Sequence, residues 1–69
     1  MRLRGIVARN LRRLRSTHGV SQEELGARAD VSGNYVGMLE REERSPTVDM
    51  LERLAAALDV APERFFDRD

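Results

Sequence analysis

The 69-residue chain has no cysteine, no lysine, no tryptophan and no long hydrophobic run. Without cysteine, neither a disulfide framework nor a thiolate metal site can form. The longest apolar run, residues 54–58, is far too short to span a membrane. The basic start at Met1–Arg4 has no apolar segment behind it, so it is not a secretory signal. These absences predict a soluble, cytoplasmic protein with no membrane association.

Length and composition predict one small domain over residues 1–69. The hydrophobic fraction of 41% suits a globular protein near the lower size limit for folding without metals or disulfides. Twelve arginines balance twelve acidic residues, although residues 1–15 contain six arginines and no acid. A basic face is therefore compatible with zero net charge, and an ordinary solvated surface is the alternative. The absence of lysine carries no functional meaning, because a GC-rich genome gives the same bias.

Helical periodicity predicts an all-α fold of five helices. Residues 3–17 carry Val7, Leu11 and Leu14 at helical spacing, and Gly19 is typical of the position after a helix end. Two short helices follow at residues 21–29 and 32–41. A fourth helix, opened by Pro46 with Ser45 or Thr47 as its cap, is expected to bury the apolar stripe Val48, Leu51, Leu54, Ala55 and Leu58. Residues 62–66 form a last short helix.

Residues 21–41 predict a helix-turn-helix. Ser21 and Ser32 are N-caps, and Glu24 lies three residues after Ser21, as in a capping box. Asp30 must adopt a left-handed conformation in the turn, which aspartate tolerates better than most residues. Two helices this short cannot bury enough apolar surface alone, so the other helices must support them. Such an arrangement commonly places one helix end in a DNA major groove.

The run LRRLRSTHGVSQEELGARADVSGNYVGMLER, followed by SPTVDMLERLAAALDV, resembles the lambda-repressor-like DNA-binding domains of the Cro/repressor or Xre type. The matching markers are Arg15, Gln22, Tyr35–Val36, Leu39–Glu40, Pro46, Leu54–Ala55 and Leu58. The resemblance implies a compact five-helix domain with the third helix as the recognition helix. It also implies a transcriptional regulator that binds two-fold symmetric operator DNA as a homodimer. Such a protein would be associated with the nucleoid.

The resemblance assigns the positions that would contact DNA: Ser21, Gln22, Ser32, Gly33, Asn34, Tyr35, Met38 and Arg44. Gln22 matches a glutamine that binds phosphate and braces the recognition helix. Asn34 suits adenine, because an amide can make two hydrogen bonds to its edge, and Met38 suits a thymine methyl. Tyr35 could bond a phosphate through its hydroxyl, pack its ring against the second helix, or do both, and Arg44 could instead be a solvated loop residue. Arg9, Asn10 and Arg13 could also reach phosphates.

The remaining assignments concern structure and assembly. Arg15 and Glu40 match an internal ion pair of the family, which ties the first helix to the end of the third. Phe65 and Phe66 are candidates for the dimer interface, with one expected to close the core and the other to be covered by the partner. The single histidine, His18, lies beside the C-terminal end of the first predicted helix, where the helix dipole favours its positively charged form. No catalytic set, metal site, cofactor or small-molecule ligand is expected.

The chain also departs from the family pattern. Asp30 and Glu42 stand where relatives commonly have glycine, Gly33 and Gly37 replace larger recognition residues, and Glu42 and Glu43 place negative charge near the expected DNA backbone. An alternative function is therefore a protein-interaction module of the same fold, an antitoxin or adaptor. It would use the acidic residues of the last two helices: Asp49, Glu52, Asp59, Glu63, Asp67 and Asp69. With no residues after Asp69 for a ligand domain, and an ending LDVAPERFF, a small restriction–modification controller is the expected subtype.

Overall fold

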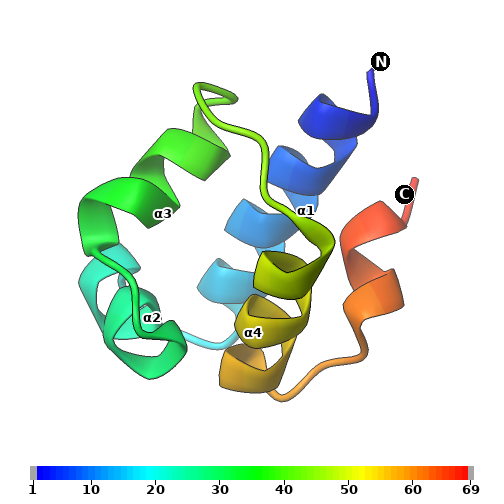
Figure 1. Cartoon of the computed structure of the whole chain (residues 1–69). Helices are drawn as coiled ribbons and strands as arrows, with labels where there is room; N and C mark the ends of the chain where they lie inside the picture. Colours follow the sequence, from blue (N-terminus) through cyan, green and yellow to red (C-terminus); the bar gives the residue numbers. More distant parts are fainter. Residues whose placement is uncertain (1, 69) are drawn as a thin grey trace.

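The computed structural model describes residues 2–68, which contain four α-helices and one 3-10 helix (Figure 1). The elements are α1 (Leu3–Thr17), α2 (Gln22–Ala29), α3 (Gly33–Glu40), α4 (Val48–Leu58) and η1 (Pro62–Phe66). The all-helical prediction is confirmed. The prediction of a fifth α-helix is wrong, because η1 is a 3-10 helix of five residues. A segment that short gains too few i to i+4 hydrogen bonds to sustain an α-helix.

The starts of α2, α3 and α4 are set by side-chain caps. The hydroxyl oxygens of Ser21, Ser32 and Thr47 each accept a hydrogen bond of 3.0 Å from the backbone N–H three residues later. Thr47, not Ser45, is therefore the cap of α4, and Pro46 lies just before the helix. No helix of the described residues is long and apolar enough to cross a membrane.

The helix ends use left-handed residues. Gly19 follows α1 with φ of 65°, while Asp30 and Asp59 end α2 and α4 with φ of 62° and 56°. The left-handed conformation predicted for Asp30 is therefore present. Glu42 after α3 has φ of 63°, and its N–H donates to the Leu39 carbonyl oxygen in a Schellman-type ending. That position normally favours glycine, because a side chain there costs about 1–2 kcal/mol.

Replacing Glu42 by glycine is expected to raise the free energy of unfolding by about 0.5–1 kcal/mol, since relief of the left-handed strain outweighs the extra freedom of glycine in the unfolded chain. Urea unfolding followed by circular dichroism measures the change. Arg44→Gly is the matched control, because Arg44 lies in the same loop without a positive φ. Equal destabilisation by both glycines would contradict the expectation.

The core is formed where all five elements meet. α2 packs against α3 and α4, α1 packs against α3 and η1, and α4 also contacts η1 (Figure 1). The most deeply buried apolar side chains are Leu11, Leu25, Val36, Leu54, Leu58 and Phe65. In Figure 1 the two ends of the chain lie on one side of the molecule, away from α2 and α3. The fold therefore separates the helix-turn-helix from the terminal segments.

The last segment is fastened to α1 by polar groups. Asn10 is fully buried, and its amide donates to the carbonyl oxygens of Phe65 at 2.8 Å and Asp67 at 2.7 Å. Arg13 donates to the amide oxygen of Asn10 at 2.6 Å, and Arg9 donates to the Asp67 carbonyl oxygen at 3.0 Å. The suggestion that Asn10 reaches a phosphate is wrong, because both ends of its amide are used inside the protein.

Candidate nucleic-acid interface

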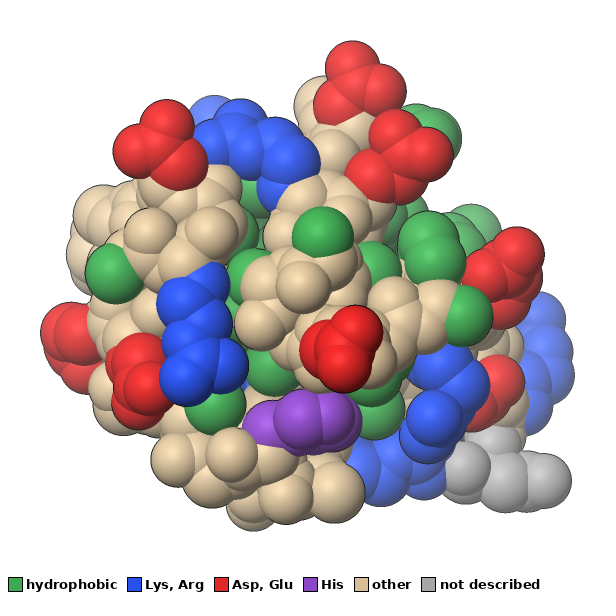
Figure 2. All heavy atoms as spheres, turned by 90° about the horizontal axis from the view of Figure 1, so that it is seen from below, with side chains coloured by type: hydrophobic (Ala, Val, Ile, Leu, Met, Phe, Trp, Pro, Cys, Tyr) green, Lys and Arg blue, Asp and Glu red, His purple; other side chains and the backbone are tan. Residues whose placement is uncertain are grey.

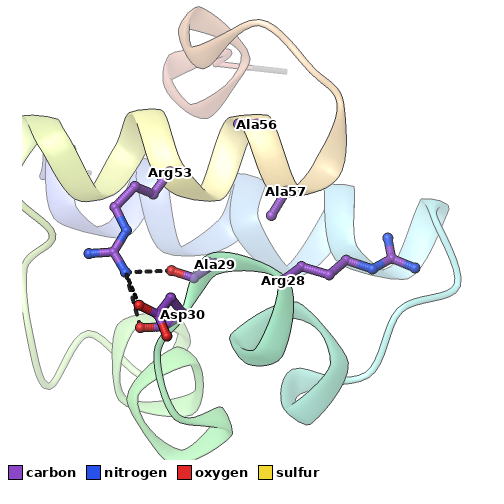
Figure 3. A pocket seen from close by; sticks show the side chains of 6 residues that line it. All are labelled: Arg28, Ala29, Asp30, Arg53, Ala56 and Ala57. Atoms are coloured by element: carbon purple, nitrogen blue, oxygen red, sulfur yellow. Dashed lines mark hydrogen bonds and ion pairs between the residues drawn. The ribbon is translucent and has the colours of Figure 1, made fainter.

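The turn between α2 and α3 is held from α4. Arg53 Nη2 donates to the carbonyl oxygens of Ala29 at 2.6 Å and Asp30 at 3.0 Å (Figure 3). These are carbonyls at the C-terminal end of α2, where the helix itself offers no further donors. Arg53 therefore fastens α4 to the turn that sets the relative orientation of α2 and α3.

The C-terminal end of α3 is held by a buried carboxylate. Glu40 is 4% exposed, and its two oxygens accept from Arg15 Nε at 2.6 Å and Nη2 at 3.1 Å. Gln22 Nε2 of α2 donates to the same carboxylate at 3.0 Å. Arg15 also donates to the Val20 carbonyl oxygen at 3.0 Å, and Arg12 donates to the Glu40 carbonyl oxygen. The contacts of Glu40 thus join α1, α2 and α3.

Hydrogen bonding to Glu40 raises the pKa of Arg15 above its usual range, and partial burial opposes the rise. The guanidinium therefore stays protonated at every pH at which the domain would be handled. Gln22, predicted as a phosphate contact and a brace, uses its amide nitrogen as a brace. Its side chain is half-buried at the first residue of α2, next to the surface of α3.

The outward face of α3 carries the predicted base-reading residues. Ser32 and Asn34 are exposed, whereas Tyr35 and Met38 are half-buried. Asn34 and Met38 are four residues apart, so they lie on one face of the helix. The Tyr35 side chain packs against the core. The exposed part of this face is small, because α3 has only eight residues.

Gly33 lies at the contact between the two helices. A Cβ atom at this position would be 2.9 Å from Cα and 3.0 Å from the backbone nitrogen of Glu23. Gly33 therefore lets α3 approach the first turn of α2 closely. It has no side chain with which to read a base.

Ser21 and Ser32 occupy equivalent positions at the starts of α2 and α3. Each hydroxyl oxygen accepts a backbone N–H, which leaves its own proton able to bond an external acceptor. The first-turn N–H groups of a helix also favour negative charge. The two exposed hydroxyls and two helix starts therefore give this surface hydrogen-bond donors suited to phosphate.

The loop after α3 is charged and exposed. Arg41 donates to the Glu43 carboxylate from Nε at 2.9 Å and Nη2 at 3.3 Å, and hydrogen bonding to Arg41 lowers the pKa of Glu43. Arg44, a predicted contact, is exposed in the same loop. Arg41 was not singled out from the sequence. The only available signal was its position directly after α3, beside a glycine one turn earlier.

The acidic residues considered for a protein-interaction surface are not all alike. Asp49, Glu52, Asp59 and Glu63 are exposed on α4, the following turn and η1. Asp67 is half-buried and forms an ion pair with Arg64 at 3.0 Å, and Asp69 lies outside the described residues. Figure 2 shows a face on which acidic and basic side chains alternate with apolar ones. The face seen there is not uniformly acidic.

An apolar patch lies where the two ends of the chain meet α4. We call Leu3, Val48 and Phe66 the terminal patch; their exposed fractions are 55%, 75% and 40%. The expectation that Val48 is buried is wrong, because it stands at the first turn of α4 beyond the covering helices. Phe65 is fully buried in the core, so it is not a surface residue. Phe66 is the phenylalanine left for an interface.

Two shallow pockets adjoin the terminal patch and share Val48, Leu51 and Phe66. Arg4 borders one pocket, whereas Glu52 and Glu63 border the other. The patch is thus apolar at its centre and carries opposite charges on its two sides. Elsewhere in residues 2–68, no group of three His, Asp or Glu side chains is placed to hold a metal ion.

Comparison with known proteins gives consistent matches. The helix-turn-helix family HTH_3 matches residues 11–65. The chain is 46% identical over 61 residues to y4dJ of Sinorhizobium fredii, an uncharacterized HTH-type transcriptional regulator, covering 88% of this chain and 79% of that protein. The crystal structure of the hypothetical transcription factor NHTF from Neisseria matches with a TM-score of 0.91 and 35% identity, covering 96% of this chain and 76% of that one. The restriction–modification controller protein C.AhdI from Aeromonas hydrophila matches with a TM-score of 0.88 and 35% identity, covering 91% of each chain.

Proposed function

Because this chain belongs to the helix-turn-helix family of the Cro/repressor type, we propose that it is a transcriptional regulator that binds a two-fold symmetric operator as a homodimer. The observation that carries the proposal is the way α3 is held. Glu40 at its buried end bonds side chains from α1 and α2, while Asn34 on its outer face is exposed. A rigidly held helix with one free polar face is what insertion into a major groove requires.

In the proposed complex, α3 lies in the major groove and Asn34 and Met38 reach base edges. Asn34 would bond an adenine, and Met38 would contact a thymine methyl group. The surrounding residues would bind the sugar–phosphate backbone and fix the register. They are Ser21, Gln22, Ser32, Tyr35 and Arg44, with Gly33 allowing the close approach of α2 and α3.

The proposed dimer is formed through the terminal patch by a second copy of the chain. A two-fold axis near Phe66 would bury the apolar centres against each other, and Arg4 of one copy could face Glu52 or Glu63 of the other. The domain measures 29 × 23 × 21 Å, and in Figure 1 the two ends of the chain lie away from α2 and α3. Two such domains can place their recognition helices about 34 Å apart, one turn of DNA.

The relatives support one kind of regulator. The likeness to a restriction–modification controller over nearly all of both chains supports a small regulator of the controller type. Such a protein needs no cofactor or small-molecule ligand for the contacts described above.

The deciding experiment is selection of bound sequences from a random duplex pool. The expected result is a two-fold symmetric motif with half-sites about 10 base pairs apart. A dimer that neutralises about eight phosphates should also lose affinity with salt at a log–log slope of about −7. If no duplex binds more tightly than about micromolar even at low salt, where every phosphate contact is strongest, the alternative takes its place: an interaction module using the exposed acids of α4 and η1.

Replacing Asn34 by alanine is expected to reduce discrimination at one base pair per half-site by about 1–3 kcal/mol, because two amide hydrogen bonds to the base edge are lost. Binding to unrelated duplexes should stay unchanged. Fluorescence anisotropy with the selected operator and its single-base variants measures the effect. Ser16→Ala, an exposed polar substitution on α1, is the control. Uniform weakening on every sequence would contradict base reading by Asn34.

A further inference from the structure

Arg41 and Glu43 form an ion pair in the loop after α3. The proposed base reading by Asn34 and Met38 does not involve this pair. Two nitrogens of Arg41, Nε and Nη2, face the two oxygens of Glu43 at 2.9 and 3.3 Å. This paired geometry is also the one with which arginine binds a phosphate group. Both side chains are about half exposed, at 53% each, so the pair is open to exchange with an external anion.

The position of Arg41 places it at the proposed DNA surface. A Cβ atom at Gly37 would lie 2.9 Å from Nη1 of Arg41 and 3.3 Å from Oε1 of Gln22. The guanidinium therefore lies against the bare backbone of α3, next to the first residue of α2. A larger residue at position 37 would displace it. The glycine that weakens the recognition surface as a base reader thus makes room for an arginine.

We propose that Arg41 is a phosphate-binding residue of the DNA interface and that Glu43 occupies it in the free protein as an internal substitute for phosphate. The inference rests on the proposed function and adds that Glu43 competes with DNA phosphate for Arg41. DNA binding exchanges the carboxylate of Glu43 for a backbone phosphate on Arg41. Glu43 thereby lowers the affinity for any duplex without changing which sequence is preferred.

Glu42 provides a matched comparison, because it is an exposed acid beside Glu43 and forms no ion pair among residues 2–68. Glu43→Gln and Glu42→Gln remove the same charge from the same loop. Both are compared with the wild-type chain and again in the background of Arg41→Ala. The dissociation constant for a mixed-sequence duplex is measured by anisotropy at low salt, with circular dichroism to verify folding. This probe suits a phosphate contact, which does not depend on sequence.

Glu43→Gln is expected to tighten binding about two- to fivefold more than Glu42→Gln, the range of one exposed ion pair. In the Arg41→Ala background the two substitutions should have equal effects on the dissociation constant. Arg41→Ala itself should lower the magnitude of the log–log slope of affinity against salt by about 0.9, because one phosphate contact is lost. If the two acids act alike while Arg41 is present, Glu43 is not a competitor and the inference is wrong, although the proposed function stands. If neither the wild-type chain nor any variant binds duplex, the proposed function fails and the inference fails with it.

Discussion

Replacing Arg15 by alanine is expected to lower the free energy of unfolding by about 3 kcal/mol, because it leaves the buried Glu40 carboxylate without its cationic partner. Only the Gln22 amide, at 3.0 Å, would remain on that carboxylate. The upper end of the usual range, about 5 kcal/mol, applies to fully dry pairs. The Arg15 side chain is 22% exposed, so water can partly replace it. For a domain of this size the loss corresponds to a fall in Tm on the order of 10–20 °C.

The reverse substitution, Glu40→Ala, should cost less than Arg15→Ala. The Glu40 side chain is 5% exposed and too short to turn out into water, whereas the longer Arg15 side chain can turn outward when its partner is removed. The structure thus predicts an asymmetry between the two partners of one ion pair. Urea unfolding of both variants, followed by circular dichroism, measures it.

Arg28→Ala is the matched control for the loss of an arginine in an ion pair. Arg28 donates to Glu24 at 2.7 Å, but both side chains are about half exposed, so the expected loss is about 0.3–0.5 kcal/mol. The Glu24 carboxylate accepts this hydrogen bond from Arg28. In the predicted capping box it would accept from the Ser21 N–H instead. Losses below about 0.5 kcal/mol in both Arg15→Ala and Glu40→Ala, the level of a surface pair, would show that the buried pair does not stabilise the fold.

The features that could be predicted from sequence are those set by local chemistry. Ser21 and Ser32 cap helices because their hydroxyls reach backbone N–H groups three residues away. Gly19 and Asp30 end helices because they tolerate positive φ. The resemblance to the Cro/repressor type is confirmed by the family match over residues 11–65.

The errors arose where the outcome depends on which elements cover a residue. Val48 fits the periodic stripe of α4, yet it projects beyond the neighbouring helices. Asn10 is polar, yet it lies fully buried, because two backbone carbonyl oxygens of the last segment meet it there. The apolar and polar pattern within one helix does not show which other helices will cover each of its residues.

The interface shows the same limit. Arg53 acts on carbonyl oxygens more than twenty residues away, and Arg41 is placed by the path of an exposed loop. Neither contact has a spacing that sequence reading can recognise. The residues carried over by resemblance, such as Asn34, were identifiable because their positions on α3 are fixed by the register of one short helix. Their contacts with DNA stay predictions.

Replacing Phe66 by aspartate is expected to dissociate the proposed homodimer and to weaken operator binding by about 10²–10⁴-fold, the factor gained when two half-sites are bound together. The reason is that a charge at the centre of the terminal patch must lose its water on dimerisation without gaining a partner. The fold should survive, because Phe66 is 40% exposed whereas the adjacent Phe65 fills the core. Circular dichroism and thermal melting verify that survival.

Two readouts separate assembly from DNA contact. Analytical ultracentrifugation gives the oligomeric state, and anisotropy compares an operator duplex with a duplex carrying a single half-site. Phe66→Asp should lose affinity for the full operator and keep it for the half-site, because the substitution changes no residue of α3. Ala56→Glu also adds one negative charge, and it lies at an exposed position two turns along α4 from Val48. It should change neither the oligomeric state nor the affinity.

Val48→Asp provides an independent probe of the same surface, because Val48 is the most exposed member of the terminal patch and belongs to another element. If the patch is the dimer interface, both aspartates must shift the monomer–dimer equilibrium in the same direction, and operator affinity must fall in proportion. A dimer that persists in both variants would place the two-fold axis elsewhere. A wild-type chain that is monomeric and binds only single half-sites would contradict the homodimer itself while leaving the reading of DNA by α3 intact.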